Sequence, residues 1–105
     1  MASVIKFEKE ERQALEVHVQ SPDGGESVYQ LPLSGSLNMG ESMGLMKAYD
    51  APEEKRDNAF FVWFYDFACR NVSKVVVDSL TTDQFRQLAD TWQSESQAAG
   101  ASLGE

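Results

Sequence analysis

The segment that most constrains this chain is the aromatic run within Ala59–Arg70, where six of the eleven aromatic side chains occupy eight consecutive positions. In a helix, four of them recur at i, i+3, i+4 and i+7 and form one apolar stripe: Phe60, Trp63, Phe64 and Phe67. Asp66 and Arg70, four residues apart with the acid first, then suit an ion pair on the outer surface. A strand is the alternative, because every second residue from Phe61 to Phe67 is aromatic.

The residues just before this run favour the helix over the strand. Asp50 can cap a helix, Pro52 suits a first helical turn, and Glu53 has capping-box spacing from Asp50. The helix is expected to end near Asn71, which tolerates the left-handed conformation past a helix end. Its apolar perimeter is wider than one side of a small domain needs. We interpret it as the middle of the core, and contact of part of it with another protein is the alternative.

Composition limits the class of protein. A length of 105 residues suits one domain, and 42% hydrophobic with 25% charged residues is typical of a globular chain. The net charge of -8 argues against nucleic-acid binding. No apolar run approaches the length of a membrane span, and residues 1–11 lack the apolar core of a signal peptide, so we expect a cytoplasmic protein without a membrane partner. The single cysteine, Cys69, is expected to be buried and inert.

Residues 14–33 carry the pattern of a β-hairpin. Leu15, Val17 and Val19 alternate with polar residues, as a strand with one buried face requires. Turn-forming residues occupy positions 21–26, and residues 28–33 supply the return strand with its inward side chains at Tyr29, Leu31 and Leu33. Pro32 places that end at a sheet edge or beyond the pairing. A short apolar trio within residues 1–12 is interpreted as an additional edge strand: Val4, Ile5 and Phe7.

Residues 37–49 are predicted to form a helix with a methionine stripe. Asn38 and Glu41 have the spacing of a helix start. Three methionines recur at i, i+4 and i+7: Met39, Met43 and Met46. We interpret this stripe as core, while a pliable surface that repacks around varied partners is the alternative. Gly40 and Gly44 lower helix propensity and allow close backbone approach.

The last third of the chain is predicted to contain an extended segment and a helix. The β-branched residues of 72–77 favour an extended conformation. Thr81 and Gln84 have capping-box spacing, and an apolar helical stripe follows at Phe85, Leu88, Ala89 and Trp92. The fold class expected is therefore α+β, an N-terminal hairpin packed with about three helices. One globular domain is expected over residues 1–93, and a flexible tail rich in Ser, Gly and Ala over residues 94–105.

The sequence carries no motif for catalysis or for cofactor binding. It contains no glycine-rich phosphate loop, no clustered metal ligands and no nucleophile elbow. His18 is the only histidine, and no second group is placed by motif to act with it. We therefore expect no enzyme activity, no metal and no organic cofactor. The chemistry that remains is that of a small acidic module for binding or assembly.

Several residues of the C-terminal third carry a resemblance to a known family. Residues 80–85 read Leu-Thr-Thr-Asp-Gln-Phe, Leu88 and Trp92 follow, and residues 100–105 close the chain with Gly-Ala-Ser-Leu-Gly-Glu. This region, about the last 26 residues, resembles the C-terminal part of the tail assembly chaperones of long-tailed bacteriophages, especially those that infect actinobacteria. The order of an N-terminal hairpin, a Leu-Pro-Leu element at residues 31–33 and then helices is also similar.

The resemblance implies a non-catalytic chaperone of virion assembly in the host cytoplasm that is absent from the mature virion. Its partners would be the tape measure protein, which it keeps soluble, the tail-tube protein, and further copies of itself. In such families a programmed ribosomal frameshift appends a second domain to the shorter protein. Residues 94–105 would then correspond to the junction with that domain. The residues expected to bind the partner are Met39, Met43, Met46, Phe61, Tyr65, Phe85, Leu88 and Trp92. A virion structural protein, such as a tail or head-tail connector subunit, and a cytoplasmic interaction adaptor are the alternatives.

Overall fold

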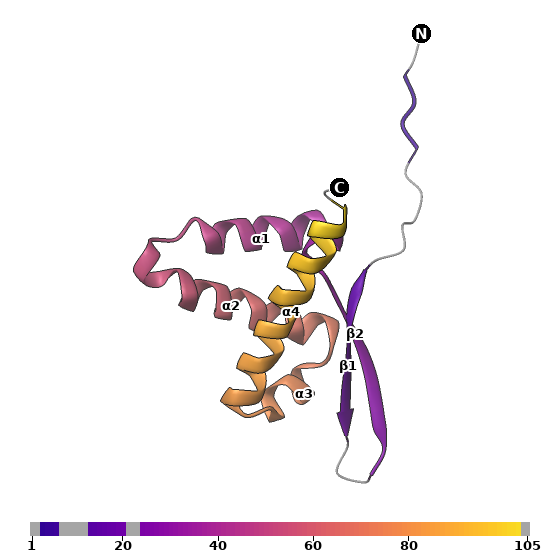
Figure 1. Ribbon diagram of the computed structural model, residues 1–105, viewed down its shortest axis with the longest axis vertical. Helices are drawn as coiled ribbons and strands as arrows, with labels where there is room; N and C mark the ends of the chain where they lie inside the picture. The colour runs from indigo at the N-terminus through magenta and orange to yellow at the C-terminus, as the bar shows by residue number, and fades with distance from the viewer. Residues whose placement is uncertain (1–2, 7–12, 21–23, 104–105) are drawn as a thin grey trace.

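The computed structural model describes residues 3–6, 13–20 and 24–103, and the side chains among them up to residue 99. A two-stranded hairpin precedes four helices, as Figure 1 shows. The order is β1 (Ala14–Gln20), β2 (Glu26–Pro32), a 3-10 turn (Ser34–Ser36), α1 (Met39–Tyr49), α2 (Glu53–Asn71), α3 (Lys74–Ser79) and α4 (Thr82–Leu103). Helices α1 and α2 form a helical hairpin that α4 crosses, and the strands lie along one side (Figure 1). The predicted α+β class and its N-terminal hairpin are confirmed, with one helix more than predicted.

The hairpin pairs its strands antiparallel over their whole length. The register runs from Ala14 opposite Pro32 to Gln20 opposite Glu26. As predicted, the side chains of one face turn inward, and Leu31 and Leu33 are buried while Leu15 and Val17 pack against the core. Ala14 and Pro32 end the ladder, a position at which a residue without an N–H is tolerated.

Reciprocal hydrogen bonds fix the starts of two helices where their sequence spacing predicts them. The Asn38 side chain accepts from the Glu41 N–H at 2.8 Å, and the Glu41 carboxylate accepts from the Asn38 N–H at 3.0 Å. The same exchange joins Thr81 and Gln84 at the start of α4. Each box satisfies backbone N–H groups that a helix start leaves without partners. The expected cap at Asp50 is wrong: Asp50 ends α1, and Pro52 precedes α2 without a side-chain cap.

The core lies between α2 and α4 and is closed by β2. The aromatic stripe of α2 is buried as predicted, with Phe64 fully buried and Phe60 and Phe67 nearly so, whereas Trp63 is half-buried. The Trp92 ring of α4 lies 5.4 Å from that of Phe64, measured between centroids. Ten buried residues form the cluster: Leu31, Leu33, Leu45, Phe60, Phe64, Phe67, Ala68, Val77, Ala89 and Trp92.

Residues 74–79 are helical, so the extended conformation predicted for 72–77 is wrong. The helix is only six residues long, and the helix propensity of valine is only slightly unfavourable. The helical conformation buries Val77 against the core and leaves Val75 exposed. Lys74 and Asp78, four residues apart, are ion-paired at 2.5 Å along it. Tertiary burial of Val77 and this local pair outweigh the strand preference of the valines.

The structure also extends α4 beyond the expected domain boundary at residue 93. The helix continues to Leu103, and Ser96 within it is buried. The Ser96 hydroxyl accepts from the Ser34 N–H at 3.1 Å, and Ala99 packs against the core cluster. Small residues therefore continue the helix here because they fit against the turn that follows β2. The tail was expected to begin at residue 94, whereas the helix ends at Leu103.

The N-terminal segment differs from its prediction where the structure describes it. Residues 3–6 form no strand, and Val4 and Ile5 are 88% and 77% exposed. They project beyond the end of the hairpin, away from the helices (Figure 1). Residues 3–6 therefore do not form the predicted edge strand. Phe7, the third residue of the apolar trio, lies outside the described residues.

Candidate functional site

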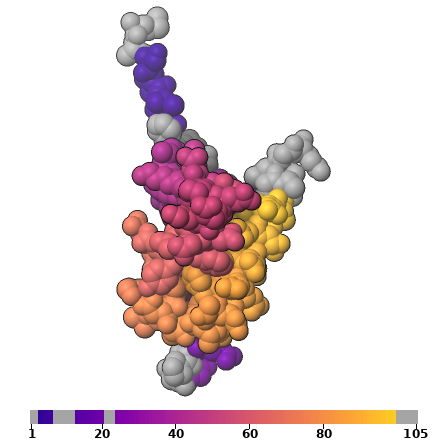
Figure 2. Space-filling model, turned by 90° about the vertical axis from the view of Figure 1, so that its left-hand side faces the viewer, coloured from indigo at the N-terminus to yellow at the C-terminus, as the bar shows by residue number. Residues whose placement is uncertain are grey.

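The methionine stripe of α1 faces solvent, so its interpretation as core is wrong. Met39, Met43 and Met46 are 73%, 48% and 59% exposed. Each residue turns a helix by about 100°, so these three cluster on one side and the buried Leu45 and Ala48 lie on the opposite side. Figure 2 shows α1, in magenta, forming the upper part of one face of the molecule. The stripe is an apolar surface on a helix whose start is capped by Asn38 and Glu41.

A glycine lets α1 pack closely on α2 while the methionines point outward. A Cβ atom placed on Gly44 would lie 2.7 Å from the Trp63 indole nitrogen, which is closer than real Cβ atoms approach. A larger residue at this position would therefore displace the Trp63 indole or push the two helices apart. Gly40, one turn earlier, would meet only the Asn38 side-chain oxygen at 3.5 Å. The buried side of α1 thus combines the small residues Gly44 and Ala48 with Leu45, and the methionines lie on the exposed side.

The predicted aromatic contact residues of α2 and α4 gather at one seam between those helices. The Phe61 and Phe85 rings lie 6.2 Å apart, and the Tyr65 and Phe85 rings lie 6.3 Å apart. Phe61 and Phe85 are half-buried, and Tyr65 is 38% exposed. The Arg86 guanidinium lies 5.8 Å from the centre of the Phe61 ring, a cation–π contact that covers part of this seam. The seam therefore offers less free apolar surface than the methionine stripe.

Trp92 is not available to a partner, and its prediction as a contact residue is wrong. It is 1% exposed, and its indole N–H donates to the Pro32 carbonyl oxygen at 2.8 Å. Its ring and its polar atom are both satisfied inside the fold, so it fixes α4 against the end of β2. Leu88, the last of the predicted contact residues, is half-buried and lies apart from the methionine stripe, on the wall of a groove beside β1.

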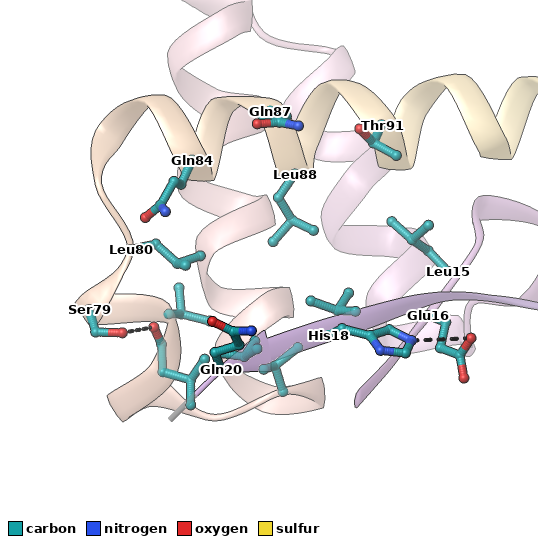
Figure 3. A pocket seen from close by; sticks show the side chains of 15 residues that line it. Leu15, Glu16, His18, Gln20, Ser79, Leu80, Gln84, Gln87, Leu88 and Thr91 are labelled. Atoms are coloured by element: carbon teal, nitrogen blue, oxygen red, sulfur yellow. Dashed lines mark hydrogen bonds and ion pairs between the residues drawn. The ribbon is translucent and has the colours of Figure 1, made fainter. Parts of the chain in front are cut away.

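This groove, with a volume of about 540 Å³, runs between β1 and the helices α3 and α4. Aliphatic side chains line most of it, and in Figure 3 Leu88 points from α4 toward β1 while Leu80 closes one end. Glutamines and a threonine of α4 form its rim. No sequence pattern predicted this groove, because its walls come from segments more than 50 residues apart.

His18 lies on the outer face of β1, as its place in the strand pattern predicts. Its Nδ1 atom lies 2.9 Å from a Glu26 carboxylate oxygen, and its Nε2 atom lies 3.4 Å from Glu16 (Figure 3 draws the latter). Hydrogen bonds to Glu26 first and Glu16 second raise the pKa of His18 above its ordinary value. Both ring nitrogens are thus occupied by surface carboxylates.

A polar cluster joins α2 to α3 near the aromatic seam. The Tyr65 hydroxyl donates to Asp78 at 2.5 Å, and the Lys74 ammonium donates to the other oxygen of the same carboxylate at 2.5 Å. Lys74 and Tyr65 hold the pKa of the Asp78 carboxyl below its usual range, while Asp78 raises the pKa of Tyr65. All three groups are exposed, so the cluster is a surface tie between helices. The Lys74 and Asp78 spacing could have signalled it had residues 74–79 been predicted as a helix.

Comparisons of the chain with protein-family models, with curated proteins and with solved structures find no match. Within the described residues, no helix is both long enough and apolar enough to cross a membrane. The same part of the chain holds no group of three or more His, Cys, Asp or Glu side chains arranged for a metal ion. Cys69 is a free, half-buried thiol on α2.

Proposed function

We propose that this chain is a tail assembly chaperone of a long-tailed bacteriophage that binds the tape measure protein through the methionine stripe of α1. The exposure of Met39, Met43 and Met46 is the observation that carries the proposal. Thioether side chains are flexible and polarisable, so they pack against varied apolar surfaces, and an exposed stripe of them is typical of proteins that bind amphipathic helices.

The remaining surface supports the same activity. Each chain carries a net charge of -8, and the mutual repulsion of such charges opposes non-specific aggregation through an exposed apolar stripe. A long helical client with an apolar face would gain solubility from such a coat. The client contact is proposed to centre on α1, with the exposed edge of the Phe61, Tyr65 and Phe85 seam as a secondary contact. Tail-tube subunits would be recruited to the client held in this way.

The deciding experiment is co-expression with the tape measure protein encoded near this chain, scored by how much of that client is soluble and co-purifies. The test variant replaces the three methionines with glutamine, which keeps the helix propensity and the side-chain length. We expect it to lose most of the co-purified client while melting at the temperature of the unchanged chain. Substitution of Val62 and Val75 by glutamine is the matched control, because both are as exposed but lie elsewhere.

A client that stays soluble with the triple-glutamine variant would overturn the assignment of the stripe. A client that is insoluble with every version of the chain would overturn the chaperone function itself. The proposal further expects the chain to be absent from purified virions, which mass spectrometry of particles measures. Its stoichiometric presence there would point to a virion structural protein.

A further inference from the structure

The hydrogen-bond pattern of the hairpin shows which backbone groups of β1 face away from β2. The Leu33 N–H donates to the Gln13 carbonyl at 2.8 Å, while the Gln13 N–H donates to the Ser36 hydroxyl at 3.0 Å. The inward-facing groups of Gln13 and Leu33 place these two residues at a hydrogen-bonded position of the ladder. Such pairs alternate along an antiparallel ladder, and the register then leaves Glu16 opposite Gln30 as a pair without mutual bonds. The backbone N–H and C=O groups of Glu16 and His18 therefore point outward. No described residue bonds to them.

This free edge of β1 borders the groove. The groove is lined by six consecutive residues of β1, Leu15–Gln20, and by none of β2, so it lies on the side of the strand away from its partner. Its far wall is apolar and includes Val76, Leu80 and Leu88. An unpaired strand edge beside an apolar wall is the arrangement to which extended segments add as a further strand.

The chain itself carries a segment of matching chemistry. Residues 3–6, the N-terminal arm, read Ser-Val-Ile-Lys and expose two β-branched side chains that favour strands. In a strand, Ile5 would face one side while Val4 and Lys6 face the other. The groove contains the Glu16 carboxylate and no lysine or arginine, so a segment with a basic residue is complementary to it. Ile5 would meet the apolar wall, and Lys6 would lie near Glu16.

We propose that the N-terminal arm of one copy adds as a third strand to the free edge of β1 in a second copy. The occupant comes from another copy because the arm projects away from its own groove, beyond the far end of the body (Figures 1 and 2). This inference does not rest on the chaperone proposal, because the methionine stripe on α1 takes no part in it.

Sedimentation velocity of the full chain and of two variants tests the exchange. Val4→Asp with Ile5→Asp removes the apolar arm without touching the folded body. Glu16→Pro removes the outward N–H of β1 without breaking a bond to β2, and Gln30→Pro is the matched control at the partner position on the other edge. We expect the unchanged chain and Gln30→Pro to sediment as dimers or larger assemblies. The arm variant and Glu16→Pro should each sediment as monomers.

Mixing the two monomeric variants then separates exchange between copies from the alternatives. The arm variant keeps an intact edge and Glu16→Pro keeps an intact arm, so together they should form a one-to-one complex. Circular dichroism melting of each variant verifies that the fold is intact. If the unchanged chain is a monomer, the proposal is overturned, and the arm binds either the groove of its own copy or no groove at all. Assemblies that survive the arm substitutions, or a mixture that stays monomeric, would also overturn it.

Discussion

Helices α1 and α2 each carry an apolar stripe of the same spacing, but one stripe is exposed to solvent and the other is buried. Met39, Met43 and Met46 recur at i, i+4 and i+7 and are exposed, while Phe60, Phe64 and Phe67 have the same spacing and are buried. The difference arises from the side of α1 that carries small residues, where Gly44 lets the helix approach Trp63 of α2. Apolar periodicity thus predicts a stripe, whereas the fit of the opposite side decides which side of a helix is buried.

The largest expected effect separates the two stripes by their contribution to folding. Phe64→Ala should lower the free energy of unfolding by about 3 to 5 kcal/mol, because Phe64 is fully buried among aromatic rings and its loss leaves a cavity. Met43→Ala on the exposed stripe should change it by no more than about 0.5 kcal/mol. Urea denaturation measures both. Equal losses for the two variants would show that the methionine stripe is packed in solution.

An intermediate effect tests why α1 presents this side to solvent. Gly44→Ala should destabilise the fold by about 1 to 3 kcal/mol, because the added methyl overlaps the Trp63 indole. Gly40→Ala is the matched control on the same helix, and it should stabilise by about 0.5 to 1 kcal/mol, since no close contact opposes the gain in helix propensity. The pair is compared by thermal and urea melting. Stabilisation by both alanines would contradict the close approach of α1 to α2.

The smallest effect concerns the outer face of the hairpin, where charge takes the place of apolar contact. Hydrogen bonds to Glu26 and Glu16 raise the pKa of His18, so its stabilising contribution is fully present below the unfolded value of about 6.5 and is lost as pH rises through the folded pKa. In an NMR titration, Glu26→Gln should move the His18 midpoint down toward 6.5. Glu53→Gln, which removes the same charge from α2, should not. An unchanged His18 midpoint in Glu26→Gln would show that the hydrogen bond to Glu26 does not raise the pKa of His18.

The sequence predicted those parts of the candidate site whose signals lie within one turn of helix or one strand. The box between Asn38 and Glu41 located α1 and its methionine stripe, and the spacing itself was correct. The orientation of the stripe was not predictable, because it depends on a contact between Gly44 and Trp63 across a helix pair. Trp92 was misassigned for a related reason. The carbonyl that accepts its N–H belongs to Pro32, 60 positions away.

The sequence by itself determined the α+β class, the hairpin pattern and the starts of α1 and α4, since alternation and reciprocal caps act between residues two to seven positions apart. Only the tertiary structure decided that 74–79 is helical, that α4 continues past residue 93, and that the methionines face solvent. Each of these depends on burial against a distant segment, as with Val77 in the core and Ser96 on Ser34. Local preferences amount to a few tenths of a kcal/mol per residue, and burial of one large side chain exceeds them.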